Sequence, residues 1–230
     1  MADKYEKIAH TGWKDLDRAG KIQYIKDYYT LPIILGIVVL IFVVWAVVYF
    51  GFTSQKPALY VMTVNVSAPA EKEAELEKEL AAYLELGRRE NVVWDDTTAA
   101  GGEEYNLFLK LTTLLGAHVL DALVFSDGDK EMLENLGAFS TLQEALGDDA
   151  LSRLEAAGRV VEGLSPDLGD GEARYPCAMA VDLTGSKAAA DWGLTPLNGE
   201  HIYLAISVTP EHPEAAAALI DYLLAPELAQ

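Results

Sequence analysis

Five polar residues stand at the ends of two apolar, strand-like runs in the second half of the chain. Asp95, Asp96 and Thr97 close the first run, and Ser126 and Asp127 close the second. Parallel α/β sheets gather the carboxyl ends of their strands at one edge, where ligand-binding loops lie. We therefore predict that these five residues form a ligand- or partner-binding edge. Taken singly, each is also typical of turns and helix caps.

Residue spacings typical of catalysis do not accompany this edge. Ser186 and Lys187 are neighbours in sequence, and because adjacent side chains generally point apart, we expect an ordinary loop serine. The four histidines are His10, His118, His201 and His212. They show neither the helical spacing nor the clustering of zinc ligands. The sequence thus predicts a non-enzymatic protein with no metal site and no cofactor.

Two acidic loops leave weak calcium binding open as an alternative. Asp127, Asp129 and Glu131 alternate as at the start of an EF-hand loop, but Met132 stands where that loop needs glycine. We expect Asp127 or Asp129 to cap the helix that begins there. The second loop, residues 165–172, is also rich in carboxylates.

Strands and helices that alternate along the chain must position these residues. The predicted order is strand 58–66, helix 67–87, strand 91–96, helix 103–117, strand 118–126 and helix 129–138. Such alternation predicts parallel strands joined by right-handed crossover helices, in one α/β domain over residues 58–230. We expect a helix and a ribbon within 147–172. The last helix has an apolar stripe of Leu219, Ile220, Leu223 and Leu224.

Residues 31–52 contain no charged side chain and are long enough to cross a bilayer as a helix. They lack the small-residue cleavage site of a signal peptide, so we predict a permanent anchor. Residues 1–30 are then a juxtamembrane segment, and residues 53–57 form a linker to the domain. The only cysteine, Cys177, excludes an intrachain disulfide and is expected to be buried.

Charge is distributed unevenly about this anchor. The basic residues close to it are Lys4, Lys7, Lys14, Arg18, Lys21 and Lys26 on one side and Lys56 on the other. The positive-inside rule therefore places the N-terminus in the cytoplasm and the domain outside. Of the 17 basic residues 11 follow the anchor, and of the 36 acidic residues 31 do, so this part carries a net charge of about −20. Such a charge disfavours nucleic acid and anionic lipid as partners.

The outer domain resembles the first lobe of extracellular solute-binding proteins. The likeness is one of pattern and order, in residues 120–127, 131–137 and 139–142, and in the returning strand 171–181 and the closing segment 202–228. It implies a three-layer α/β lobe with a mostly parallel mixed sheet. The second lobe of that family is replaced by residues 184–200, and 17 residues cannot form one.

The N-terminal part, around residues 21–40, also resembles uncharacterised membrane proteins of Gram-positive anaerobes, a family that brings no activity with it. We therefore expect a non-enzymatic, single-pass membrane protein whose one-lobed domain serves as an interaction or accessory module, with a membrane protein or transporter as partner. The alternative is a substrate-binding receptor for a transporter or sensor. The two hypotheses differ in the site they need: an enclosed pocket for the receptor and an open face for the module.

Overall fold

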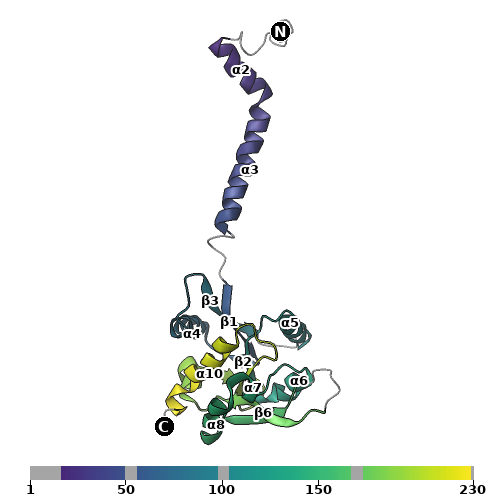
Figure 1. Cartoon of the computed structure of the whole chain (residues 1–230), viewed down its shortest axis with the longest axis vertical. Coiled ribbons are helices and arrows are strands. Elements are labelled where there is room, and N and C mark those ends of the chain that lie inside the picture. Colours follow the sequence, from purple (N-terminus) through teal and green to yellow (C-terminus); the bar gives the residue numbers. More distant parts are fainter. Residues whose placement is uncertain (1–16, 50–55, 98–103, 167–172, 229–230) are drawn as a thin grey trace. The chain divides into compact units, whose positions relative to one another are not determined.

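The computed structural model describes residues 17–49, 56–97, 104–166 and 173–228, and the ends and three intervening segments lie outside this description (Figure 1). Contacts divide the chain into two units, Met1–Ser54 and Gln55–Gln230. The predicted linker, 53–57, spans this division, although Lys56 and Pro57 already belong to the first strand of the second unit.

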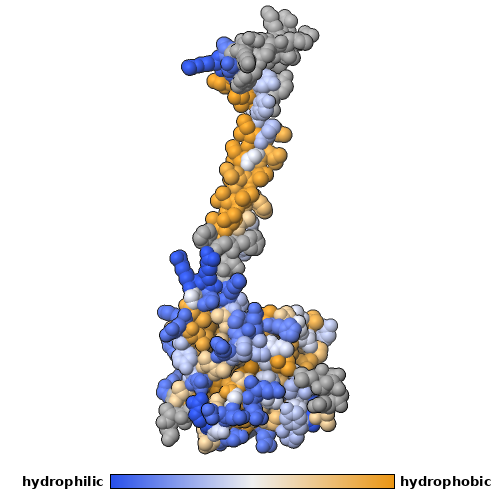
Figure 2. All heavy atoms as spheres, viewed as in Figure 1, coloured by the Kyte–Doolittle hydropathy of each residue, from blue (hydrophilic) through white to orange (hydrophobic). Residues whose placement is uncertain are grey.

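The first unit contains two helices, α2 (Arg18–Tyr28) and α3 (Thr30–Val48), with Tyr29 between them. Asp17 caps α2 by accepting a hydrogen bond of 2.8 Å from the Gly20 N–H. Helix α3 has 19 residues, none of them buried, and is apolar along most of its length, as the orange spheres show in Figure 2. At about 1.5 Å per residue it is nearly as long as the hydrocarbon core of a bilayer is thick. It is the one candidate membrane-spanning helix among the described residues.

The second unit is an α/β domain built on a six-stranded mixed sheet of order β3-β1-β4-β8-β6-β5. The strands are β1 (Lys56–Val64), β3 (Glu90–Thr97), β4 (Ala122–Ser126), β5 (Val160–Leu164), β6 (Pro176–Asp182) and β8 (Ile202–Ile206). β1 pairs in parallel with β3 and β4, whereas the β4–β8, β8–β6 and β6–β5 pairs are antiparallel. Strands β3, β1, β4 and β6 therefore share one direction.

Helices cover both faces of this sheet, so the domain has the three layers predicted. The helices are α4 (Ala70–Tyr83), α5 (Glu104–Gly116), α6 (Lys130–Asn135), α7 (Leu142–Leu146), α8 (Asp148–Ala156), α9 (Lys187–Trp192) and α10 (Pro213–Leu228). One core lies between the sheet and α4, α7, α8, α9 and α10, and the other lies between the sheet and α5 and α6. Successive side chains of a strand point to opposite faces, so Val61 joins the first core and Met62 the second.

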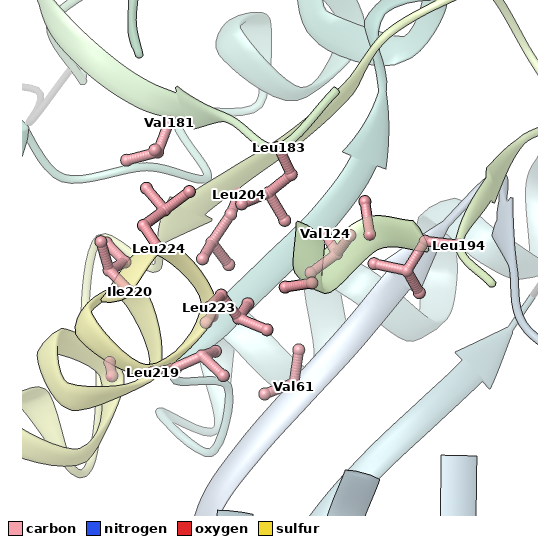
Figure 3. Packing of buried hydrophobic residues seen from close by; sticks show 14 of the residues in the cluster. Val61, Val124, Val181, Leu183, Leu194, Leu204, Leu219, Ile220, Leu223 and Leu224 are labelled. Atoms are coloured by element: carbon pink, nitrogen blue, oxygen red, sulfur yellow. The ribbon is translucent and has the colours of Figure 1, made fainter. Parts of the chain in front are cut away.

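Helix α10 is a major part of the first core. Its predicted stripe of Leu219, Ile220, Leu223 and Leu224 is at most 2% exposed. Figure 3 shows these side chains directed toward Val61, Val124 and Leu204 of the sheet. The apolar stripe at helical spacing is thus explained by burial against three strands that are distant in sequence.

The helix predicted within 147–172 is confirmed as α8, whereas of the predicted ribbon this range contributes the single strand β5, which pairs with β6 beyond it. The end predicted for the first helix of the domain is wrong. Helix α4 stops at Tyr83, four residues before Gly87, because Glu85 adopts a left-handed conformation with φ of 51° and the Leu86 N–H bonds back to the Ala81 carbonyl. Helix α5 ends at Gly116, one residue before its predicted end, and His118 after it is left-handed (φ 56°), so β4 starts only at Ala122.

Candidate functional site

The carboxyl ends of the four strands that share a direction meet at one edge of the sheet, and the five predicted site residues belong to this edge. Asp95 and Asp96 nevertheless point to opposite faces, because they are neighbours in a strand. Thr97 ends β3 opposite Val64 of β1. Ser126 and Asp127 follow on β4, on the other side of β1. The edge thus brings the five residues to one region but divides the side chains of the two aspartates of β3, of Ser126 and of Asp127 between several contacts.

Asp95 is engaged within the second core. Its carboxylate accepts a hydrogen bond from the Tyr60 hydroxyl at 2.5 Å and an ion pair from Lys110 Nζ of α5 at 2.7 Å. Burial and the neighbouring Asp95 raise the pKa of Tyr60, so the phenol remains a donor. Asp95 therefore ties α5 to β1.

Asp96 lies on the opposite face, against α4. Its carboxylate accepts a hydrogen bond of 3.0 Å from the Thr63 hydroxyl. Burial, a hydrogen bond to Asp96 and the charges of Asp96 and Glu77 raise the pKa of Glu73 from 4.5 to about 7. Glu73 is consequently partly protonated at neutral pH, which reduces its repulsion from Asp96.

Ser126 and Asp127 hold a segment of the chain itself, residues 195–201, which begins with the short strand β7 (Thr195–Pro196). The fully buried Ser126 hydroxyl donates to the Asn65 carbonyl and accepts the N–H groups of Leu197 and Asn198 at 3.2 and 3.4 Å. Asp127 accepts the N–H groups of Glu200 and His201 at 2.8 and 2.9 Å.

Electrostatics show the same engagement of Asp127. Burial alone would raise the pKa of this carboxyl group, but the backbone N–H groups of His201 and Glu200 lower it below its ordinary value. Asp127 is therefore ionised at neutral pH and stabilised by the segment that it holds.

This segment fills the position between β1 and β4 where the crossovers switch from one face of the sheet to the other. Doubly wound α/β proteins bind ligands in the crevice at such a point. Here β7 pairs with the short strand β2 (Val66–Ser67), which leaves the main sheet after Asn65. A Cβ atom at Gly199 would lie 2.0 Å from Asp127 Oδ1, and one at Gly128 would lie 2.5 Å from the Asn198 carbonyl oxygen. The fit leaves no room for side chains at either glycine.

Asp129 completes these contacts and was not among the predicted site residues. Its Oδ1 accepts the side-chain amides of Asn65 and Asn198 at 2.9 and 3.0 Å. The expected capping role of Asp127 or Asp129 is wrong, because neither the 3-10 turn Asp127–Asp129 nor α6 has a side-chain cap. Both carboxylates instead bind residues about 70 positions away. Local sequence patterns do not predict contacts over such a separation.

A histidine not predicted to be functional lies at the same edge. His201 Nδ1 is 3.8 Å from Asp182 Oδ2 at the end of β6, and its ring stacks on Tyr203 with 6.0 Å between centroids. Burial and the charges of Asp182 and Asp127 raise the pKa of Tyr203. The described residues contain no group of three or more His, Cys, Asp or Glu side chains placed to hold a metal ion. The second acidic loop, from residue 167 to 172, and His10 lie outside those residues.

Ser186 and Lys187, the neighbouring pair considered above for catalysis, have structural partners. Ser186 is almost fully buried and caps α9 by accepting the Ala189 N–H at 3.1 Å. Lys187 Nζ lies 2.5 Å from Asp191 on the surface of the same helix. Cys177, expected to be buried, is only partly so, and burial followed by the charges of Glu144 and Glu134 raises its pKa.

An open groove of about 610 Å³ lies on the face covered by α5 and α6. Its lining residues are Phe108, Gly128, Glu131, Met132, Asn135 and Leu136. Their mixture of apolar and polar types was not singled out in the sequence. The apolar spacing of α5 could have indicated it, because that helix carries more apolar residues than one buried face requires.

Comparison of the sequence with known protein families and with curated proteins finds no match. The geometry of the site is therefore the basis on which a function can be argued.

Proposed function

We propose that this protein is a non-enzymatic, single-pass membrane protein whose α/β domain lies outside the cytoplasm and docks a protein partner. The observation that carries the proposal is the filling of the strand-end crevice by residues 195–201, through Ser126, Asp127 and Asp129. A receptor that captures a solute there would have to displace its own chain.

The membrane part of the proposal rests on α3 and on the charges around it. Helix α3 has the length and composition of a membrane span, and basic residues are concentrated before it. The positive-inside rule then places the N-terminus in the cytoplasm. The net charge of about −20 after the anchor is compatible with a soluble outer domain and with neutral or basic protein partners.

Energetics also favour a protein over a small solute. High-affinity sites enclose about 70 to 90% of a small ligand's surface, which solute-binding proteins achieve by closing two lobes. The pattern likeness to one such lobe stays a prediction, and the 17 residues 184–200, which stand where that family has its second lobe, are too few to form one. A protein partner can supply the missing wall and gains from about 800 Å² buried on each side.

The test is site-specific photo-crosslinking of the full chain in the membranes of the cells that express it. A photoreactive residue replaces Asp96 at the strand edge, Glu131 in the groove, or Glu155 on α8 as the control. The proposal expects a discrete protein adduct from at least one of the first two positions and none from Glu155. Absence of any protein adduct from Asp96 and Glu131 would contradict it.

A further inference from the structure

The groove between α5 and α6 has an apolar floor. Phe108 of α5 lines it together with Met132 and Leu136 of α6, and Gly128 contributes no side chain. Phe108 is 45% exposed, although it directly follows the buried Leu107 and stands about one turn before the buried Leu111. An aromatic ring half-open to solvent in an apolar groove is a common anchor point for a partner's side chain.

The outer face of α5 extends this apolar surface. Tyr105 and Leu109 are 74% and 52% exposed. Phe108 and Leu109 follow Tyr105 by three and four residues, so the three side chains lie on the same side of the helix. The only charged residue after the first position of α5 is Lys110, which is bound to Asp95. In Figure 2, orange spheres reach the surface in the part of the domain where Figure 1 places α5. The groove therefore continues into an uncharged helix face on a strongly acidic domain.

The rim of the groove is polar and carries a negative charge. Glu131 and Asn135 lie one turn apart on α6, and both are exposed. Within the described part of the chain, neither side chain makes a hydrogen bond or an ion pair, whereas the neighbouring Glu134 is paired with Lys130 at 3.6 Å. The rim thus offers a carboxylate and a carboxamide beside the apolar floor.

We propose that the α5–α6 groove docks a basic amphipathic helix of a partner protein, an inference that rests on the proposed docking function. Apolar residues of such a helix at positions i, i+3 and i+4 would contact Phe108, Met132 and Leu136. A lysine or arginine on its flank would pair with Glu131. A second copy of this chain and an anionic membrane surface fit less well, because the domain carries a net charge of about −20 and both would repel it.

The test uses the full chain in nanodiscs of neutral lipid at physiological salt, with three synthetic helical peptides as probes. Two share a leucine face and carry lysine or glutamate on the polar face, and the third is the lysine peptide with its leucines redistributed. Calorimetry should show the lysine peptide binding at least tenfold more tightly than either of the others. The redistributed peptide separates docking from plain charge attraction to an acidic protein.

Variants of the chain localise the binding. Phe108→Ser should weaken binding of the lysine peptide at least tenfold, and Glu131→Lys about threefold, the size expected for one exposed ion pair. Tyr83→Ser, which changes a half-exposed aromatic residue of α4 on the opposite face of the sheet, should have no effect. Thermal unfolding checks that each variant is folded. Because Glu131 is on the surface, Glu131→Lys keeps the test valid if Phe108→Ser fails to fold.

Equal binding of the three peptides, or full affinity in a folded Phe108→Ser chain, would overturn the inference. So would a dimer of the wild-type chain that Phe108→Ser dissociates, or binding of phosphatidylserine vesicles that the same change abolishes. The crosslinking experiment separates this failure from failure of the proposed function. An adduct at Asp96 but not at Glu131 supports the docking function and contradicts only the assignment of the groove as the docking site. Peptide binding in the groove without any cellular adduct contradicts the docking function instead.

Discussion

Replacement of Glu73 by glutamine should change how the stability of the outer domain depends on pH. Glu73 on α4 meets Asp96 on β3, with Glu77 one turn away, and its pKa is raised from 4.5 to about 7. A carboxyl group that binds its proton more tightly in the folded state stabilises that state at low pH. This contribution is complete below about pH 4.5 and is lost as the pH rises through 7.

The size of the effect follows from the two pKa values. One pKa unit corresponds to about 1.4 kcal/mol, so full conversion would give about 3 kcal/mol. Glu73 is only half-buried, and solvent screens its repulsion from Asp96, so we expect about 1 kcal/mol. Glutamine keeps a hydrogen-bond donor for Asp96 and removes the second charge. Glu73→Gln should therefore match the wild type at pH 5 and be more stable by about 1 kcal/mol at pH 8.

Urea denaturation of the Gln55–Gln230 unit between pH 5 and pH 8 measures this difference. Glu71→Gln is the matched control, because it removes a carboxylate from the same first turn of α4 at an exposed position. The control loses the same favourable interaction with the helix dipole, so it should be no more stable than the wild type at any pH. Parallel stability profiles for Glu73→Gln and Glu71→Gln would refute the raised pKa of Glu73 beside Asp96.

Four further outcomes are expected. Gly199→Ala should lower the free energy of unfolding by about 2 kcal/mol in thermal unfolding, because φ is 120° and the new Cβ meets Asp127. Gly185→Ala is the control and should lower it by about half as much, because its φ of 66° is also unfavourable but its Cβ enters open space. Asp121→Ala should cost about 3 kcal/mol, because this fully buried carboxylate accepts the N–H groups of Tyr60 and His212 at 2.8 and 2.6 Å. Removal of the chain from Ala215 onward should abolish cooperative unfolding, since four buried aliphatic side chains are lost at about 1.5 to 3 kcal/mol each; a truncated domain that melts normally would exclude α10 from the core. External protease on intact cells should digest the acidic domain and spare residues 1–30, and protection of the domain would reverse the proposed orientation.

The order of elements in the outer domain could be predicted from the sequence because hydrophobic spacing reports burial directly. The apolar stripe on α10 is explained by burial of one side of that helix. The continuous apolar run of β4 is explained by burial of both faces of a central strand. Helix ends were less predictable. Glu85 adopts the left-handed conformation that glycine usually signals, so the sequence contains no marker for the end of α4, whereas Gly116 marks the end of α5 within one residue of the prediction.

For the individual polar residues of the site, the sequence predicts the position at the end of a strand but not the hydrogen-bond partners. The carboxyl edge was located correctly by the rule for parallel strands, but the partners of Ser126, Asp127 and Asp129 come from residues about 70 positions later. The groove was missed for a related reason. Phe108 and Met132 are apolar residues in helices, and only the packing of α5 beside α6 shows that they remain accessible.

The most direct test of the central claim is calorimetry of the Gln55–Gln230 unit against a panel of sugars, amino acids and short peptides. If residues 195–201 fill the strand-end crevice and one lobe supplies one wall, no compound should bind more tightly than about millimolar. A twelve-atom sugar at about 0.3 kcal/mol per heavy atom gains near 4 kcal/mol when fully engaged, which corresponds to that limit. A metabolite bound at micromolar strength, and lost on Asp95→Ala or Asp127→Ala, would contradict the docking account and establish a receptor instead.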